Sequence, residues 1–372
     1  MIDKTNPIPL YYQIQNDLFS DIESGKYHTG DRLPSERDLA VQYDVTRMTI
    51  RQAIKNLVEQ GYLEVRQGSG MFVTDRYHIN SNHPIKKGTI IGVLLPNIQR
   101  GIMIDLIRGI EDQAIATGYN TILCNSDDRF EKADMYATQL IANHVSGVIY
   151  LPIQDIENSD RKEEANRHIV ESFVQANIPI VLVDRECRAI DTDIVVSDNY
   201  GGGFELTEHL VEMGHSRIAV VYDFVETSVE DRIRGYKNAL HKHQIPFDAQ
   251  LVQKIREYGH TDSFLNKLKE IVHGFNATAI MAMNDLLAAD IFYLANKLNI
   301  SIPEELSLTG FDDLPFSKRL PTPLTTVNQP IYQMGAESFN ILKDRMEHRH
   351  PVHIKKVILP NRLVKRKSVK RL

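Results

Sequence analysis

The stretch VTRMTIRQAIKNLVEQGYLEVRQGSGMFV, residues 45–73, decides the fold of the N-terminal part of the chain. Its first half carries apolar residues at the spacing of one helix face, and they are Ile50, Ala53, Ile54 and Leu57. Its second half places short apolar runs on either side of a Gly-Ser-Gly turn, which predicts a β-hairpin. We therefore expect a helix from Thr46 to Gly61, followed by a hairpin.

Two further helices are predicted upstream of this stretch. LYYQIQNDLFSDIESG, residues 10–25, repeats an apolar residue every fourth position and stops at Gly25. GDRLPSERDLA, residues 30–40, opens with a Gly-Asp turn, after which Ser35 can cap a short helix and Asp38 can complete a capping box. Residues 1–75 are thus expected to form three helices and a hairpin.

The polar face of the third helix suits the DNA major groove. The outward residues are Arg47, Met48, Thr49, Arg51, Gln52 and Lys55. Arg pairs well with guanine and Gln with adenine, while Thr and Lys hold phosphates. A solvated amphipathic helix explains this helix alone equally well. The combination of helix, turn, helix and Gly-tipped hairpin favours DNA binding.

These motifs, together with PLYYQI at residues 9–14, resemble the winged-helix domain of the GntR family of bacterial regulators over residues 7–74. The resemblance implies contacts with operator DNA from Arg37, Thr46, Arg47, Thr49, Arg51, Gln67 and Gly68. Met48 departs from the family pattern, because a small polar residue is common at that position.

Composition limits the class of protein. With 372 residues, 42% hydrophobic and 25% charged, the chain is expected to be soluble and to hold more than one domain. It contains no apolar run of about 18 residues and no secretory signal pattern, so we expect a cytoplasmic protein without a membrane partner. The net charge of −6 hides a local basic excess between Val45 and Thr74. Cys124 and Cys187 lack CxxC spacing, which predicts buried thiols.

From residue 89 onward, short β-branched runs alternate with helical segments of 10–15 residues, which predicts parallel sheets. There are too many segments for one small sheet, so we expect two α/β lobes with a ligand cleft at the carboxyl ends of the strands. Polar residues follow the predicted strands at Asn97, Asn125, Asp127, Asp155, Asp184, Arg185, Asp198, Asn199, Asn284, Asp285, Asp312 and Asp313. Carboxylates, amides and arginines suit the hydroxyls of a polyol. Asp198, Asn199 and Asp285 are equally explained as helix caps.

Segments such as DNYGGGFELTEHLVEMGHSRIAVV (198–221) and SIPEELSLTGFDDLPFSKRLPTPLTTVNQP (301–330) resemble the effector-binding domain of the LacI/GalR family over residues 88–363. The resemblance implies a two-lobed fold like that of type I periplasmic sugar-binding proteins. It also implies ligand contacts from Asp155, Arg185, Arg232, Asn284, Asp312 and Gln329. The loop NIQRGIMID, residues 97–105, departs from the family pattern.

The expected organisation is a winged helix-turn-helix head followed by a two-lobed α/β effector domain. The expected parts are the head at 1–75, a linker at 76–88, lobe 1 at 89–184 plus 329–349, and lobe 2 at 185–328 plus 350–372. Crossovers near Asp184, Gln329 and Arg349 would return the closing strand, within 355–366, to lobe 2. The linker lacks a helical pattern, so we expect coupling through linker geometry and dimer spacing.

A GntR-type head on a LacI-type body is similar to arabinose-responsive hybrid regulators. We expect a homodimeric transcription regulator, a repressor of sugar-utilisation genes, whose effector is a pentose or deoxyhexose. A nucleobase or sugar phosphate effector is the alternative, followed by a sugar receptor without a DNA role. No cofactor or metal is expected: there is no P-loop, and His348, His350 and His353 indicate an exposed loop.

An enzyme is not expected, because no Schiff-base lysine or Ser/His/Asp set stands out. The basic segment 355–372 is interpreted as a frayed terminus or, alternatively, a second DNA-binding surface.

Overall fold

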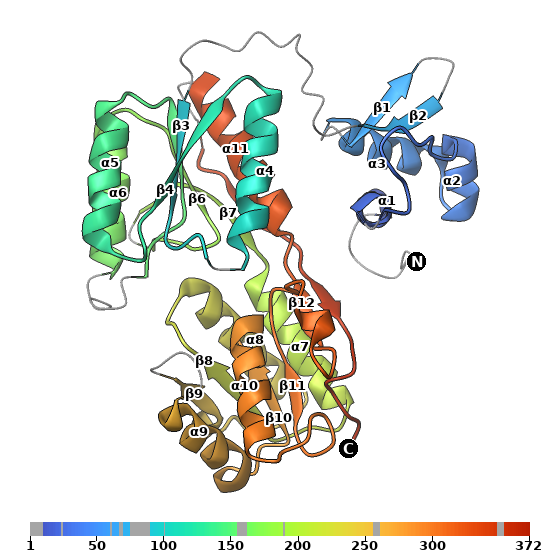
Figure 1. Cartoon of the computed structure of the whole chain (residues 1–372), viewed down its shortest axis with the longest axis vertical. Helices are drawn as coiled ribbons and strands as arrows, with labels where there is room; N and C mark the ends of the chain where they lie inside the picture. The colour runs from blue at the N-terminus through green and yellow to red at the C-terminus, as the bar shows by residue number, and fades with distance from the viewer. Residues whose placement is uncertain are drawn as a thin grey trace. The chain divides into compact units, whose positions relative to one another are not determined.

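The computed structural model describes residues 10–23, 25–59, 62–66, 70–74, 90–99, 101–154, 162–188, 190–255, 261–347 and 353–372. It contains two compact units, which we call the head (residues 10–74) and the body (residues 90–372) and describe separately (Figure 1). The linker expected at 76–88 lies outside the described residues. Among the helices described, none has the length and apolar content needed to cross a membrane.

The head has the three helices and the hairpin that the sequence predicts. Its elements are α1 (Leu10–Glu23), α2 (Glu36–Gln42), α3 (Arg47–Glu59), β1 (Leu63–Arg66) and β2 (Gly70–Val73). The predicted capping box is confirmed, because Ser35 Oγ accepts from the Asp38 amide and the Asp38 carboxylate accepts from the Ser35 amide. The two strands pair antiparallel.

The core of the head lies between α1 and α3. The predicted inner face of α3 is buried, and it consists of Ile50, Ala53, Ile54 and Leu57. It packs with Ile14 and Leu18 of α1, which are also buried. Burying one face of α3 leaves its polar face outward, as the apolar periodicity predicts.

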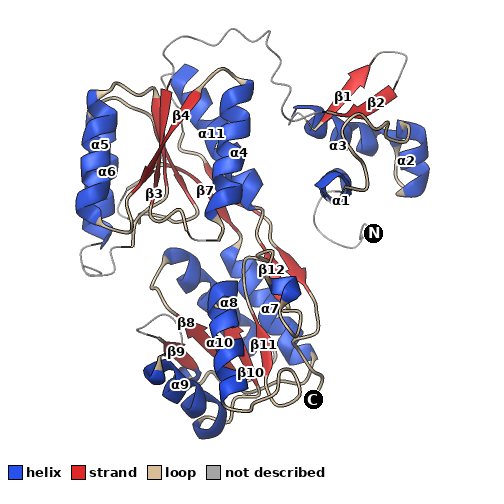
Figure 2. Ribbon diagram, viewed as in Figure 1, coloured by secondary structure: helices blue, strands red, loops and turns tan. Residues whose placement is uncertain are grey.

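The first lobe of the body is a six-stranded parallel sheet in the order β13-β7-β6-β5-β3-β4. Its strands are β3 (Ile90–Leu95), β4 (Asn120–Asn125), β5 (Gly147–Tyr150), β6 (Ile180–Val183), β7 (Asp193–Ser197) and β13 (Lys356–Leu359). Helices α4 (Met103–Ala116) and α11 (Ile331–Glu347) cover one face, and α5 (Phe130–Ala142) and α6 (Lys162–Gln175) cover the other (Figure 2).

The alternation of side chains along each strand divides this lobe into two cores. In β6, Val181 and Val183 belong to the core under α4 and α11, whereas Ile180 and Leu182 belong to the core under α5 and α6. Strands buried on both faces are continuously apolar, which is why the sequence shows them as β-branched runs.

The second lobe is a four-stranded parallel sheet in the order β11-β10-β8-β9. Its elements are α7 (Asn199–Glu212), β8 (Ile218–Tyr222), α8 (Thr227–Lys242), β9 (Val252–Lys254), α9 (Asp262–Lys269), β10 (Ala279–Ala282), α10 (Asp285–Lys297) and β11 (Ser307–Thr309). Single helical turns lie at Ala249–Leu251, Glu270–Gly274 and Ser317–Arg319. β12 (Thr326–Asn328) and β14 (Arg362–Val364) form an antiparallel pair.

The points at which the chain changes lobe differ in part from the expected boundaries. Residues 185–328 and 350–372 were expected in lobe 2, yet β7 and β13 pair with each other in the sheet of lobe 1. The first crossover therefore follows β7 rather than Asp184, and the last falls between β13 and β14. An apolar strand can extend either sheet, so its own sequence does not fix its partner.

The basic C-terminal segment is folded rather than frayed, which corrects the interpretation as a frayed terminus. Ser368 and Val369 are buried, and the Ser368 hydroxyl donates to the Leu308 carbonyl at 2.5 Å. The last amide, of Leu372, donates to the Met213 carbonyl at 2.9 Å. The segment therefore ties β11 to the end of α7.

Candidate functional site

The outer surface of the head gathers the described residues that are expected to touch DNA. Arg37, Thr46, Arg47 and Arg51 are exposed and Thr49 is half-buried. Thr46 lies just before α3, with its hydroxyl 2.9 Å from that of Thr49. The other two expected contacts, Gln67 and Gly68, lie outside the described residues.

A carboxylate from α2 holds the arginines of α3, and the sequence analysis missed it. Glu36 accepts two hydrogen bonds from the Arg51 guanidinium, at 3.2 and 2.9 Å, and lies 3.6 Å from Arg47. The hydrogen bond from Arg51 lowers the pKa of Glu36. A bidentate contact fixes the plane of the guanidinium, while most of the Arg51 side chain stays exposed. The signal was present in PSERDLA, where Glu36 immediately precedes the expected contact Arg37.

The centre of the candidate site in the body is Arg232 of α8. Its Nε donates to Asn199 Oδ1 at 2.8 Å, and its Nη1 donates to the Met283 carbonyl. The guanidinium lies over the Phe311 ring, 3.7 Å from the centroid, and 4.0 Å from Asp312. Burial lowers the pKa of Arg232, and the nearby carboxylates oppose that effect.

A chain of hydrogen bonds connects this centre to the sheet of lobe 1. Asp312, which follows β11, accepts from Gln329 Nε2 at 2.6 Å. Gln329, which follows β12, accepts from the hydroxyl of Ser197 at 2.5 Å, and Ser197 ends β7. Burial raises the pKa of Asp312 well above its usual range, although Arg232 opposes the rise. Arg232, Asp312 and Gln329 are therefore brought together.

Arg185 lies in a second buried group. Its Nε is 2.8 Å from a Glu226 oxygen and 3.5 Å from an Asp184 oxygen, and its Nη1 donates to the Pro152 carbonyl at 3.0 Å. Burial acts to lower the pKa of Arg185, but Glu226 and Asp184 outweigh it and the pKa is raised. Glu226 was not singled out from the sequence, because it follows no recognisable strand-end motif.

The remaining expected residues have different outcomes. Asn284 caps α10 by accepting from the Leu287 amide at 2.7 Å, and its Nδ2 donates to Asp223 at 3.2 Å. Asp155 lies outside the described residues. Of the strand-end residues with two explanations, Asp198 caps α7 and Asn199 joins the Arg232 centre. Asp285 is not the cap of α10, since Asn284 holds that place.

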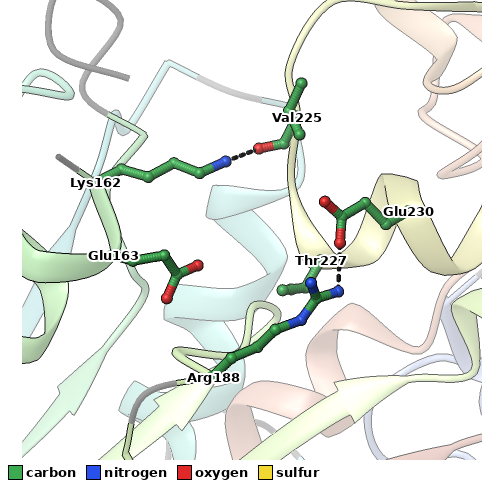
Figure 3. A pocket seen from close by; sticks show the side chains of 6 residues that line it. All are labelled: Lys162, Glu163, Arg188, Val225, Thr227 and Glu230. Atoms are coloured by element: carbon green, nitrogen blue, oxygen red, sulfur yellow. Dashed lines mark hydrogen bonds and ion pairs between the residues drawn. The ribbon is translucent and has the colours of Figure 1, made fainter. Parts of the chain in front are cut away.

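A pocket of about 450 Å³ lies between lobe 1 and lobe 2 beside the Arg185 group (Figure 3). Lobe 1 contributes Lys162, Glu163 and Arg188, and lobe 2 contributes Val225, Thr227 and Glu230. Figure 3 shows Lys162 donating to the Val225 carbonyl and Arg188 paired with Glu230. Of the expected ligand contacts that the structure describes, none lines this pocket, so the pocket is separate from the Arg232 centre.

The Arg232 centre contains hydrogen-bonding groups rather than a metal cage or a nucleophile. In the described parts of the chain, no three His, Cys, Asp or Glu side chains are grouped to hold a metal ion. Buried carboxylate, amide and guanidinium groups from both lobes can bind the hydroxyls of a small polar ligand. The fold and the site together define a ligand-responsive DNA-binding regulator.

Comparison with known proteins agrees with that class. Residues 10–73 match the family of bacterial regulatory proteins, gntR family, and residues 207–369 match the periplasmic binding protein-like domain. The chain is 27% identical over 380 residues to the arabinose metabolism transcriptional repressor of Geobacillus stearothermophilus, covering 99% of this chain and 100% of that protein. It is 30% identical over 295 residues to the ribose operon repressor of Halalkalibacterium halodurans, covering 77% and 81%.

Among solved structures, the body is similar to a LacI family transcriptional regulator from Enterococcus faecium with bound ribose. That likeness has a TM-score of 0.65 and 30% identity, and it covers 76% of this chain and 100% of the other. The chain therefore belongs to the transcription regulators that join a GntR-family DNA-binding head to a LacI-type, periplasmic-binding-protein-like body. It is a regulator of transcription and not an enzyme.

Proposed function

We propose that the chain represses genes of sugar utilisation in the cytoplasm, and that a small sugar bound between its lobes controls its affinity for operator DNA. The observation that carries this proposal is the buried polar chain from Ser197 through Gln329 and Asp312 to Arg232. It draws side chains from both lobes, so a ligand bound to it changes how the lobes relate. The ribose bound to the Enterococcus faecium regulator, and the similarity to repressors of arabinose metabolism and of the ribose operon, support a sugar.

The buried charges favour a neutral sugar over a sugar phosphate. Two guanidinium groups, Arg185 and Arg232, interact with five buried or nearly buried carboxylates, which are Asp128, Asp184, Asp223, Glu226 and Asp312. A phosphate would add negative charge to this excess at low dielectric. Neutral hydroxyls instead donate to the carboxylates and accept from the arginines. A pentose or deoxyhexose fits this chemistry.

For the head, we propose operator contacts from Arg37, Thr46, Arg47, Thr49, Arg51, Gln67 and Gly68. The exposure of the arginines on α2 and α3 supports this assignment for the described residues. Arg51 is suited to a base edge, because Glu36 already presents its guanidinium in a fixed plane.

We also propose that the chain acts as a homodimer, since a palindromic operator needs two heads related by a two-fold axis. Apolar side chains on α4 and on β4, one of the two edge strands of lobe 1, support a self-contact: Ile104 is 69% exposed, and Ile122 and Leu123 are about 40% exposed. Sedimentation should give twice the chain mass of 42.5 kDa. A monomer at micromolar concentration contradicts the dimer but not the effector site.

The proposal is tested by thermal unfolding of the full chain with neutral pentoses, deoxyhexoses, hexoses, their phosphates and nucleobases. A ligand at 100 times its dissociation constant adds about 2.7 kcal/mol to the free energy of unfolding. We expect one neutral sugar to raise the melting temperature and its phosphate to leave it unchanged. Asp312→Asn should remove the rise, while Asp191→Asn, an exposed carboxylate two residues before β7, should keep it.

The other outcomes separate the alternatives. If only a sugar phosphate or a nucleobase raises the melting temperature, that compound is the effector in place of a neutral sugar. No rise across the panel contradicts the sugar assignment.

A further inference from the structure

A buried carboxyl group lies behind the Arg232 centre. Asp285 is the first residue of α10, and its side chain is fully buried. One carboxyl oxygen accepts from the Leu314 amide at 2.8 Å, and the other is 2.6 Å from the hydroxyl of Thr326, which donates to it. Its hydrogen-bond partners are Leu314 and Thr326 and not Arg232 or Gln329. Any effect of Asp285 on the site is therefore transmitted through Leu314 and Thr326.

The two partners belong to the segments that carry the expected ligand contacts. Leu314 ends the turn that contains Asp312, and Thr326 begins β12, which leads to Gln329. The same turn also packs directly on the carboxyl group, because a Cβ on Gly310 would lie 2.2 Å from an Asp285 oxygen. Asp285 thus joins the two segments whose side chains meet in the 2.6 Å bond between Gln329 and Asp312.

The turn that contains Asp312 has an unfavourable backbone conformation, which contacts from its surroundings must stabilise. Asp312 has φ of 113° and Asp313 has φ of 57°, both in a region that non-glycine residues rarely occupy. Surrounding contacts must hold a backbone of this kind in place. The Asp312 amide donates to the Val327 carbonyl at 2.8 Å, and Asn328 Nδ2 donates to Asp313 at 3.2 Å. Arg366 of the C-terminal segment lies 2.5 Å from Asp313, and Asp285 adds a contact from inside the lobe by accepting from the Leu314 amide.

We propose that Asp285 is a positioning residue of the effector site, which holds the Asp312 turn against the Gln329 strand and does so more firmly when its carboxyl group is protonated. The proposal rests on the proposed function only in taking Asp312 and Gln329 as effector contacts. The geometry of the tie is independent of any ligand.

The charges around Asp285 set the direction of the proton effect. Burial raises the pKa of Asp285 to about 7, while the bonds from Thr326 and Leu314 lower it, Asp313 raises it and Arg366 lowers it. Asp312 is a further carboxylate facing Asp285 from the turn. Opening the turn exposes Asp285 to water, where its pKa returns toward its ordinary value near 3.8. The closed turn therefore binds the proton more tightly, so raising the pH toward 7 favours opening.

Hydrogen exchange of residues 311–314, followed by mass spectrometry on the full chain without ligand, tests this proposal. After correction for the intrinsic pH dependence of exchange, the opening constant in the wild type should rise by about tenfold per pH unit between pH 5 and 7 and then level off. Exchange in β3 serves as the reference for global unfolding.

Variants of Asp285 test whether its carboxyl group causes the pH dependence of the opening constant. Asp285→Asn keeps one acceptor for the Leu314 amide, and the Thr326 hydroxyl can rotate to accept from the new amide group, as it can from a protonated acid. This variant should therefore stay protected with no pH slope. Asp285→Ala should exchange rapidly at every pH. Asp290→Asn, on the same helix and half-buried, should keep the wild-type slope.

A wild type without the slope overturns the proposal. An Asp285→Asn variant that keeps the slope also overturns it and shows that another group titrates. Once the thermal panel has supplied a sugar, its affinity should fall with the same pH profile in the wild type and be level in Asp285→Asn. The hydrogen-exchange experiment needs no sugar. If no sugar in the thermal-unfolding panel binds, the proposed function is contradicted, whereas the exchange data still test whether Asp285 holds the turn.

Discussion

At the scale of single residues, both candidate sites depend on arginines that neighbouring oxygen acceptors hold in place. Glu36 fixes Arg51 on the surface of the head, where the guanidinium remains exposed. In the body, Arg232 is buried and has its partners within its own lobe before any ligand arrives. Such preorganisation reduces the ordering that binding requires.

The first prediction concerns Arg51. Replacing it with alanine removes a fork of donors suited to a base edge, so operator affinity should fall by at least about tenfold. Lys26→Ala, an exposed cation that pairs with Asp21 on the head, should change the affinity much less. Fluorescence anisotropy at fixed salt measures both, and equal losses would indicate general electrostatic attraction instead of a specific contact.

The second prediction concerns the stability of the whole chain against pH. The folded-state pKa of Asp285 is raised to about 7 from 3.8, so the stability that the protonated group confers is lost as the pH rises through that window. Between pH 4 and 7 the wild type should therefore lose about 3 kcal/mol relative to Asp285→Asn. Denaturant unfolding at a series of pH values measures the difference, and parallel curves would contradict it.

Sequence reasoning found part of each site. Arg232, Asp312 and Gln329 were expected from the family resemblance, and the structure brings them together. Glu36 was missed although it stands beside the expected contact Arg37, because its partner Arg51 lies 15 residues away. Glu226 was missed because its partner Arg185 lies 41 residues away, which no local pattern reveals. Asp285 was placed at the right strand end with two explanations, a residue of the cleft or a helix cap, and the cap is its neighbour Asn284.

At the scale of elements, the helices and strands follow from local patterns, but the pairing of the strands does not. Capping and 3.6-residue periodicity act within a few residues, so α2 and α3 were predicted well. β13 was assigned to the wrong lobe because its partner β7 precedes it by about 160 residues. The C-terminal segment was interpreted from its charge, although Ser368 and Val369 are buried between its basic residues.

The third prediction concerns the close packing of α7 and α8. A Cβ on Gly235 would lie 2.3 Å from the Tyr200 carbonyl, and one on Gly203 would lie 2.3 Å from the Arg232 carbonyl. Gly235→Ala should therefore separate the helices and lower the free energy of unfolding by about 3 kcal/mol. Gly274→Ala, whose Cβ would meet only ordinary contacts, is the control. Equal stabilities in thermal unfolding would show that the helices can shift without cost.

At the scale of the whole molecule, the chain joins a DNA-binding head to a body whose polar centre spans two lobes. We propose that a sugar at this centre changes the relation of the lobes and thereby the spacing of the two heads in a dimer. Coupling energies between two such sites are typically about 1–3 kcal/mol, which corresponds to roughly 5- to 150-fold in affinity. The sign of the coupling decides whether the sugar releases or promotes repression.

The most direct test of the central claim is a titration of the full chain with a duplex that it selects from random-sequence DNA, with and without the sugar that gives the largest thermal shift. We predict that the sugar changes the dissociation constant for DNA by at least about fivefold. Asp312→Asn should bind the duplex as tightly as the sugar-free wild type and should not respond to the sugar. A sugar that binds the protein yet leaves DNA affinity unchanged in the wild type would contradict the claim that the cleft controls the head.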